Sequence, residues 1–178
     1  MNWNDYKVES ERTMSLQFNC EKKEEMILHS IIGILTELEE LLEWKEDKIG
    51  KSEELFDIFW YLAIIGREYN LPLPKDATCS MENPFEIILS VIKIAIKMLD
   101  FLKKKLYYNK PINEDMLIQY YNEISSLLIV YANISDINIS DGLDININKL
   151  KARYPDKFSS ERAINRDLIV ERDILQGK

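Results

Sequence analysis

Apolar residues recur every three or four positions in four separate segments of the chain, which is the spacing of one face of an α-helix. We predict helices over about residues 24–45 and 53–69, over about 22 residues of NPFEIILSVIKIAIKMLDFLKKKLYY, and over MLIQYYNEISSLLIVYANI. Ser52 is placed to cap the second helix, and Pro72 and Pro74 cannot continue it. Four helices joined by short links predict an all-α fold, an antiparallel four-helix bundle.

The two ends of the chain have weaker patterns. Residues 3–19 are compatible with a short helix. After the fourth helix, SDINISDGLD predicts a less regular stretch, and ININKLKARYPDKFSSERAINRDLIVERDIL predicts one or two short helices around Pro155. We interpret the 178 residues as a single domain, with a first hairpin at 24–70, a second hairpin at 84–134 and a basic C-terminal segment at 144–175.

The two predicted hairpins align with each other. HSIIGILTELEELLE falls on LSVIKIAIKMLDFLK, which pairs Ser30 with Ser90, and ELFDIFWYLA falls on EISSLLIVYA. The acids of the first hairpin are mostly missing from the second, where Lys97 stands against Glu37. The match is compatible with a duplicated hairpin, and also with two unrelated amphipathic hairpins, which align to a similar degree.

The composition narrows the class of protein. An apolar content of 46% with 30% charged residues is that of a soluble globular protein, and the net charge of −8 argues against a general DNA-binding surface. The polar start MNWNDYKVESERTM predicts no signal peptide, and no apolar run is long enough for a membrane span. Cys20 and Cys79 are far apart and form no CxxC pair, which favours reduced thiols and a cytoplasmic protein.

Acidic residues occupy unusual positions in the first hairpin. Glu37 and Glu40 are three residues apart on the first predicted helix, and Glu54 and Asp57 repeat that spacing on the second. Residues three apart share a face of a helix, so the short turn between the helices should make the two pairs face each other. Like charges at such a distance repel unless a cation neutralises them, and Mg²⁺ or Mn²⁺ prefers oxygen ligands.

Asp57 is the strongest argument for a cation. It lies in LFDIFWYL among apolar residues, and no Lys or Arg of its own helix is within four positions. A buried aspartate without a partner costs several kcal/mol, on the order of the desolvation of its charge. The alternative is a solvated acidic surface, to which Glu39, Glu43, Glu46 and Glu53 are well suited.

Other kinds of site have less support. A di-iron carboxylate bundle needs Glu-x-x-His motifs on two helices, but the single histidine, His29, has Met26 three residues before it. We interpret His29 as a packing or cavity residue. The chain has no Gly-rich phosphate loop and no local Ser/His/Asp or Cys/His arrangement.

Two parts of the sequence resemble a known family. GILTELEELLEWK followed by EELFDIFWYL is similar to the ExxE…ExxD signature of the MazG-like, all-α nucleoside triphosphate pyrophosphohydrolases, a superfamily that includes the dimeric dUTPases and the dCTP pyrophosphatases. NINKLKARYPDKF resembles the Asn/Lys…Arg-Tyr-Pro segment of the same superfamily, and ERT near the N-terminus matches more weakly. The resemblance covers residues 24–70 and 144–167, and is less clear over 75–140. A repeated two-helix hairpin that keeps its acids in one copy is also similar to the architecture of the dimeric dUTPases.

The resemblance implies roles for particular residues. The matched metal ligands are Glu37, Glu40, Glu54 and Asp57, with Glu43 at the place of an additional acid. Either Glu40 or Glu43 is the candidate general base. The matched substrate-binding residues are Trp44, Lys45, Asn146, Lys149, Arg153 and Tyr154, of which the two aromatic ones are candidates for stacking on a base. Two features depart from the family pattern. Many members have Gly at the position of Glu39, and the spacing between the acid pairs is short here. These departures leave the identity of the base pocket undetermined.

The function that the resemblance implies is hydrolysis. We expect a Mg²⁺-dependent enzyme, with Mn²⁺ as a possible substitute, that converts a (deoxy)nucleoside triphosphate to a monophosphate and pyrophosphate in nucleotide-pool house-cleaning. A homodimer or higher homo-oligomer is expected by the same resemblance. One alternative is a non-catalytic helical bundle for regulation or interaction that keeps the fold and exposes its acids to solvent. Another is an enzyme of the same kind that acts on modified nucleotides or on alarmones.

Overall fold

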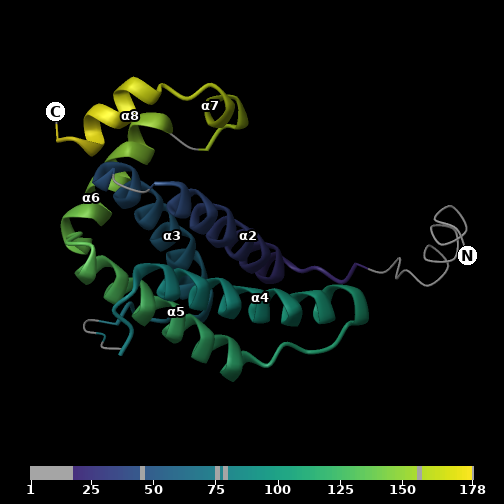
Figure 1. Cartoon of the computed structure of the whole chain (residues 1–178). Coiled ribbons are helices and arrows are strands. Elements are labelled where there is room, and N and C mark those ends of the chain that lie inside the picture. Colours follow the sequence, from purple (N-terminus) through teal and green to yellow (C-terminus); the bar gives the residue numbers. More distant parts are fainter. Residues whose placement is uncertain (1–17, 45–46, 75–76, 78–79, 156–157, 178) are drawn as a thin grey trace, which may run out of the picture.

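The computed structural model describes residues 18–44, 47–74, 77, 80–155 and 158–177 (Figure 1). Within these residues the chain forms helices and no strand, so the all-α prediction is confirmed. The predicted helix over residues 3–19 falls almost entirely outside them. The described helices are α2 Lys22–Glu43, α3 Lys48–Tyr69, α4 Pro84–Tyr108, α5 Glu114–Ile134, α6 Ile139–Arg153, α7 Ser160–Ile164 and α8 Leu168–Leu175.

Four long helices make up the body of the protein, as two hairpins. Helix α2 packs on α3 and α4 packs on α5, while α2 also contacts α4 and α3 contacts α5 (Figure 1). The sides of the helices that meet are aliphatic and aromatic, which closes the core between the hairpins. Its fully buried members include Ile31, Leu38, Leu55, Met98 and Leu128. The prediction of a four-helix bundle is therefore confirmed.

Helix α3 begins five residues earlier than predicted. Asp47, not Ser52, is the N-cap, and its side chain accepts hydrogen bonds from the backbone N–H groups of Ile49 (2.9 Å) and Gly50 (3.3 Å). Gly50 does not break the helix, because its missing side chain makes room for the ring of Trp44, which a Cβ atom would approach to 2.4 Å. Ser52 lies inside the helix and donates to the carbonyl of Lys48. The prediction that Ser52 caps this helix was therefore wrong, because Asp47 caps it earlier in the chain and Gly50 lies inside the helix.

Helix α6 occupies part of the stretch predicted to be less regular. It begins after Asn138, whose side chain accepts a hydrogen bond from the N–H of Asp141. Gly142 lies directly against the ring of Phe56 of α3, where any Cβ would collide with the ring. Because Gly142, Asn146, Lys149 and Arg153 are spaced by three or four residues, they share one face of α6. That close approach brings this face to α3.

The serines paired by the proposed repeat make the same local bond. Ser30 donates to the carbonyl of Met26 and Ser90 to that of Glu86, each at 2.8 Å and four residues earlier. This agrees with the alignment of the two hairpins, and the duplication itself stays a prediction.

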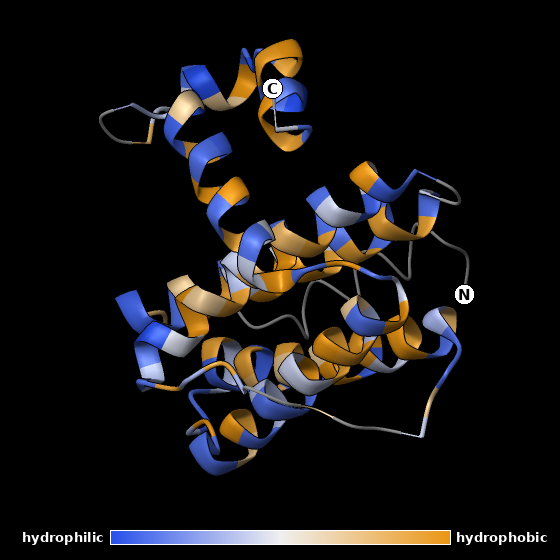
Figure 2. Cartoon of the chain, turned by 90° about the vertical axis from the view of Figure 1, so that its left-hand side faces the viewer, coloured by the Kyte–Doolittle hydropathy of each residue, from blue (hydrophilic) through white to orange (hydrophobic). Residues whose placement is uncertain are grey.

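The C-terminal helices extend from the body beside α3. Helix α8 packs on α6, and Figure 2 shows hydrophobic residues on these helices apart from the main bundle. Among the described residues, no helix combines the length and apolar character needed to cross a membrane.

Candidate functional site

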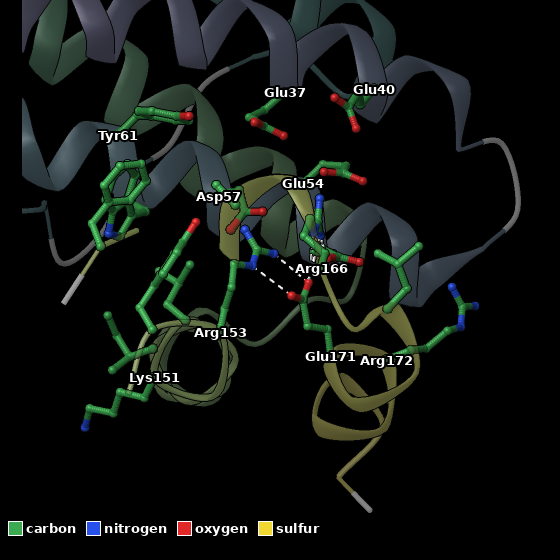
Figure 3. Close-up of a pocket in the computed structure, with 18 of the residues that line it drawn as sticks. Glu37, Glu40, Glu54, Asp57, Tyr61, Lys151, Arg153, Arg166, Glu171 and Arg172 are labelled. Carbon is green, nitrogen blue, oxygen red and sulfur yellow. Dashed lines mark hydrogen bonds and ion pairs between the residues drawn. The ribbon is translucent and has the colours of Figure 1, made fainter. Parts of the chain in front are cut away.

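A pocket of about 960 Å³ lies between the α2–α3 hairpin and the C-terminal helices. Figure 3 shows acids of α2 and α3 on one side of it and arginines from the C-terminal part on the other. Aromatic side chains complete its lining. The pocket therefore combines groups suited to a cation, to an anion and to a flat ring system.

Three of the four predicted metal ligands come together. Glu37, Glu54 and Asp57 each offer a carboxylate oxygen, and these oxygens all lie within 4.8 Å of one another. Glu40 lines the same pocket from the next turn of α2 but is outside this group, whereas Glu43 is exposed and is not part of the pocket lining. A cluster of carboxylate oxygens is the donor set that Mg²⁺ takes, so the residues present fit a hard divalent cation.

The electrostatics of the group also fit a cation. Burial, with the charges of Asp57 and Glu40, raises the pKa of Glu37 to about 8, from an ordinary value of 4.5. Burial likewise raises the pKa of Glu54. A proton therefore stays on this group at neutral pH in the metal-free protein, and a bound cation would take its place.

Asp57 has a partner that the sequence argument missed. The Lys149 ammonium group lies 2.8 Å and 3.0 Å from its two carboxylate oxygens and 3.2 Å from Glu53, and Asn146 donates to Asp57 at 2.6 Å. The helix of Asp57 has no cation within four positions, but α6 supplies one, and Glu53, which was predicted on a solvated surface, is half-buried against the same lysine. Consequently a metal is not required to explain an acid at this position.

Lys149 and Asn146 take a different place from the one that the resemblance implies. Both are buried, with 0% and 2% of their surface exposed, and neither lines the pocket. Their contacts with Asp57 fix the orientation of that carboxylate rather than reaching a phosphate. The face Gly142-x₃-Asn146-x₂-Lys149 could have indicated a polar contact with α3, because a small residue permits the approach and polar residues follow at helical spacing.

Trp44 lies beside the acid group. Its indole N–H donates to Glu54 at 2.9 Å, and its ring packs on Gly50. Trp44 also lines the pocket, but the hydrogen bond shows that it orients Glu54. Lys45, the other residue of the matched pair, is outside the described residues.

Arginines form the opposite wall. Arg153 and Tyr154, two of the predicted substrate-binding residues, line the pocket, and Arg166 and Arg172 join them from beyond the matched Arg-Tyr-Pro segment. Arg153 and Arg166 both donate to Glu171 of α8, while Arg172 pairs with Asp47. Arg166 and Glu171 were not predicted as site residues, because no periodic pattern in the sequence connects short helices to a site.

Aromatic rings contact one another in the lining of the pocket. Tyr61 lies edge-on to His29 with ring centroids 5.6 Å apart, and to Trp60 at 4.9 Å. Tyr154 and Phe158, from the C-terminal part of the chain, have ring centroids 5.3 Å apart. His29 is therefore a pocket residue, as one of its two interpretations expected. Flat rings of this kind can stack on a nucleobase.

Comparisons of the chain with protein-family models, with curated proteins and with solved structures find no match.

The acid group predicts a pH dependence of stability in the metal-free protein. Because the pKa of Glu37 is about 8 in the folded chain and near 4.5 in the unfolded one, the folded state keeps a proton that the unfolded state has lost. The free energy of unfolding should therefore fall as the pH rises from about 5 to about 8. Thermal melts in EDTA test this, and Glu37→Gln should remove most of the slope.

Mg²⁺ should counteract this loss. It competes with the proton, so the rise in melting temperature on adding Mg²⁺ should be larger at pH 8 than at pH 6. A stability that is level between pH 5 and 8 in EDTA would contradict the raised pKa of Glu37.

Proposed function

We propose that this chain is a Mg²⁺-dependent hydrolase that converts a (deoxy)nucleoside triphosphate to a monophosphate and pyrophosphate. The observation that carries the proposal is the meeting of three carboxylates within 4.8 Å on the wall of a pocket that arginines also line. A nucleoside triphosphate matches the three kinds of group in the pocket. The resemblance to the MazG-like pyrophosphohydrolases supports the same reaction, a role in nucleotide-pool house-cleaning and a homodimer.

Glu37, Glu54 and Asp57 would hold the cation. Glu40 lies one turn from Glu37 on α2. When bound, Mg²⁺ would neutralise phosphate oxygens and lower the pKa of a water molecule. Trp44 and Lys149 keep Glu54 and Asp57 oriented through the hydrogen bonds described above. Arg153 and Arg166 offer guanidinium groups, which suit phosphate oxygens.

Hydrolysis needs a group that accepts the proton of the attacking water. As the oxygen of the water bonds to phosphorus, the bond between the α-phosphorus and its bridging oxygen breaks and pyrophosphate leaves. Glu40 is exposed and lines the pocket, whereas Glu43 is exposed outside it. Of the two candidates for the general base, the geometry therefore supports Glu40.

Replacing this base should affect turnover more than binding. We expect Glu40→Gln to lower kcat by about 10²-fold, since general base catalysis contributes at least that much, with a small change in KM. Steady-state pyrophosphate release measures both constants. Glu43→Gln is the matched variant one turn away, and a larger loss there than in Glu40→Gln would transfer the role to Glu43.

The second candidate function is a non-catalytic helical bundle. The specific observation in its favour is Lys149, which neutralises Asp57 and Glu53 without any metal. In that case the acids would need no cation, and Mg²⁺ would leave the melting temperature unchanged. The raised pKa of Glu37 favours the enzyme, because Lys149 leaves that acid uncompensated.

A further inference from the structure

Helix α8 has little apolar burial and its most buried contacts are charged. Leu168, Ile169 and Val170 are 63%, 77% and 46% exposed, whereas Ile174 and Leu175 are half-buried. Its one buried residue is Glu171, with 3% of its surface exposed. A helix of eight residues has little stability of its own, so its position depends on its tertiary contacts, which include those of Glu171 together with the more exposed pair of Arg172 and Asp47.

Glu171 accepts hydrogen bonds from two guanidinium groups. Arg153 donates through Nε (2.7 Å) and Nη2 (2.5 Å), and Arg166 through Nη2 (2.8 Å) and Nε (3.2 Å). Burial opposes the charge on Glu171, but the two arginines hold the pKa of its carboxyl below the ordinary value. The carboxylate is thus ionised, and it takes the forked pair of donors that a phosphate group also takes.

This arrangement lies within the pocket. Arg153, Arg166 and Glu171 all line it, together with the acids of α2 and α3. In Figure 3, Arg153 and Arg166 lie between Glu171 and the pair Asp57 and Glu54. An anion held by a cation on those acids would meet the same two guanidinium groups that Glu171 occupies.

We propose that Arg153 and Arg166 form the binding site for the terminal phosphates of a polyphosphate, and that the Glu171 carboxylate is an internal competitor that occupies this site when the ligand is absent. The polyphosphate class rests on the proposed function. A triphosphate carries more charge and more acceptor oxygens than one carboxylate, so it displaces Glu171 from the arginines. Because Glu171 is the buried residue of α8, binding of the ligand loosens this helix, which then keeps the pair of Arg172 with Asp47 as its charged contact.

Affinity for inorganic tripolyphosphate tests the competition. In isothermal titration calorimetry with Ca²⁺ in place of Mg²⁺, Glu171→Gln should bind tripolyphosphate about tenfold more tightly than the wild type does. The reason is that the arginines lose a charged partner in this variant. Asp173→Asn removes the same charge from an exposed position of α8 and should change the affinity less than twofold. Arg166→Gln should weaken binding about tenfold. Unchanged or weaker binding by Glu171→Gln would overturn the proposal, because a residue that only positions the arginines gives that result.

Hydrogen exchange in the wild-type protein tests the loosening of α8 without any substitution. Saturating tripolyphosphate should speed exchange of the amides in 168–175 while those of α4 stay protected. Slower exchange in α8 would overturn the proposal, since it would show that the ligand fastens the helix. Neither measurement needs nucleotide hydrolysis. If no nucleotide is hydrolysed but Glu171→Gln still binds tripolyphosphate more tightly, only the proposed function fails. If a nucleotide is hydrolysed but Glu171→Gln does not bind more tightly, only the competition by Glu171 fails.

Discussion

Replacing Asp57 with alanine should lower the free energy of unfolding by about 3 kcal/mol, because it leaves a buried ammonium group without its main partner. Lys149 is fully buried and contacts both oxygens of Asp57, and Glu53 is its remaining acidic partner. Urea unfolding in EDTA measures the loss directly, free of any contribution from a metal.

The double variant Asp57→Ala/Lys149→Met is the control. Removing both charges leaves no unpaired ammonium, so the double variant should be more stable than Asp57→Ala alone. A loss below 1 kcal/mol for the single variant, on the order of an exposed ion pair, would show that Lys149 does not depend on Asp57.

Replacing Glu54 with glutamine should lower pyrophosphate release by about 10³-fold or more, since a bound metal supplies several kcal/mol to the transition state. Glutamine has nearly the same shape and can still accept the hydrogen bond from Trp44, so the change is confined to the charge of a metal ligand. The reaction is followed with saturating Mg²⁺ and nucleotide.

Glu39→Gln is the matched control for Glu54→Gln. Glu39 is an exposed acid of α2 that is outside the pocket lining, and its replacement should keep more than half of the activity. Equal losses in the two variants would mean that total negative charge matters rather than the acid group in the pocket.

Periodicity alone was enough to predict the body of the fold. The four long helices appear where apolar residues recur, because tertiary packing and helical period select the same residues. The start of α3 was missed for a local reason. Gly50 is ordinarily a breaker, but here its missing side chain accepts the Trp44 ring, and no sequence rule shows which glycine is used in that way.

The residues of the acid group could be predicted from the sequence, but the cation that contacts one of them could not. The spacing of Glu37, Glu54 and Asp57 placed them on facing sides of one hairpin, and the structure brings their oxygens together. The cation beside Asp57 was missed, because Lys149 is 92 residues away in the chain and reaches α3 only through the contact at Gly142. Long-range pairs of this kind depend on the fold, whereas local spacing does not.

Lys149 explains the buried charge of Asp57 without a metal. From the sequence, Asp57 is the strongest reason to expect a cation, but in the structure its carboxylate pairs with Lys149. Glu37 has no such partner among the described residues, and its pKa is raised to about 8 by burial and by the neighbouring acids. An acid that stays protonated beside two others shows that negative charge is disfavoured there, which agrees with the proposed cation site.

Release of pyrophosphate from a panel of nucleoside and deoxynucleoside triphosphates, with Mg²⁺ or Mn²⁺, tests the central claim most directly. We predict metal-dependent release from at least one of them by the wild-type chain, with its loss in EDTA and in Glu54→Gln. Silence on every nucleotide with both metals, from a protein that is folded by its thermal melt, would contradict the hydrolase and leave the non-catalytic bundle.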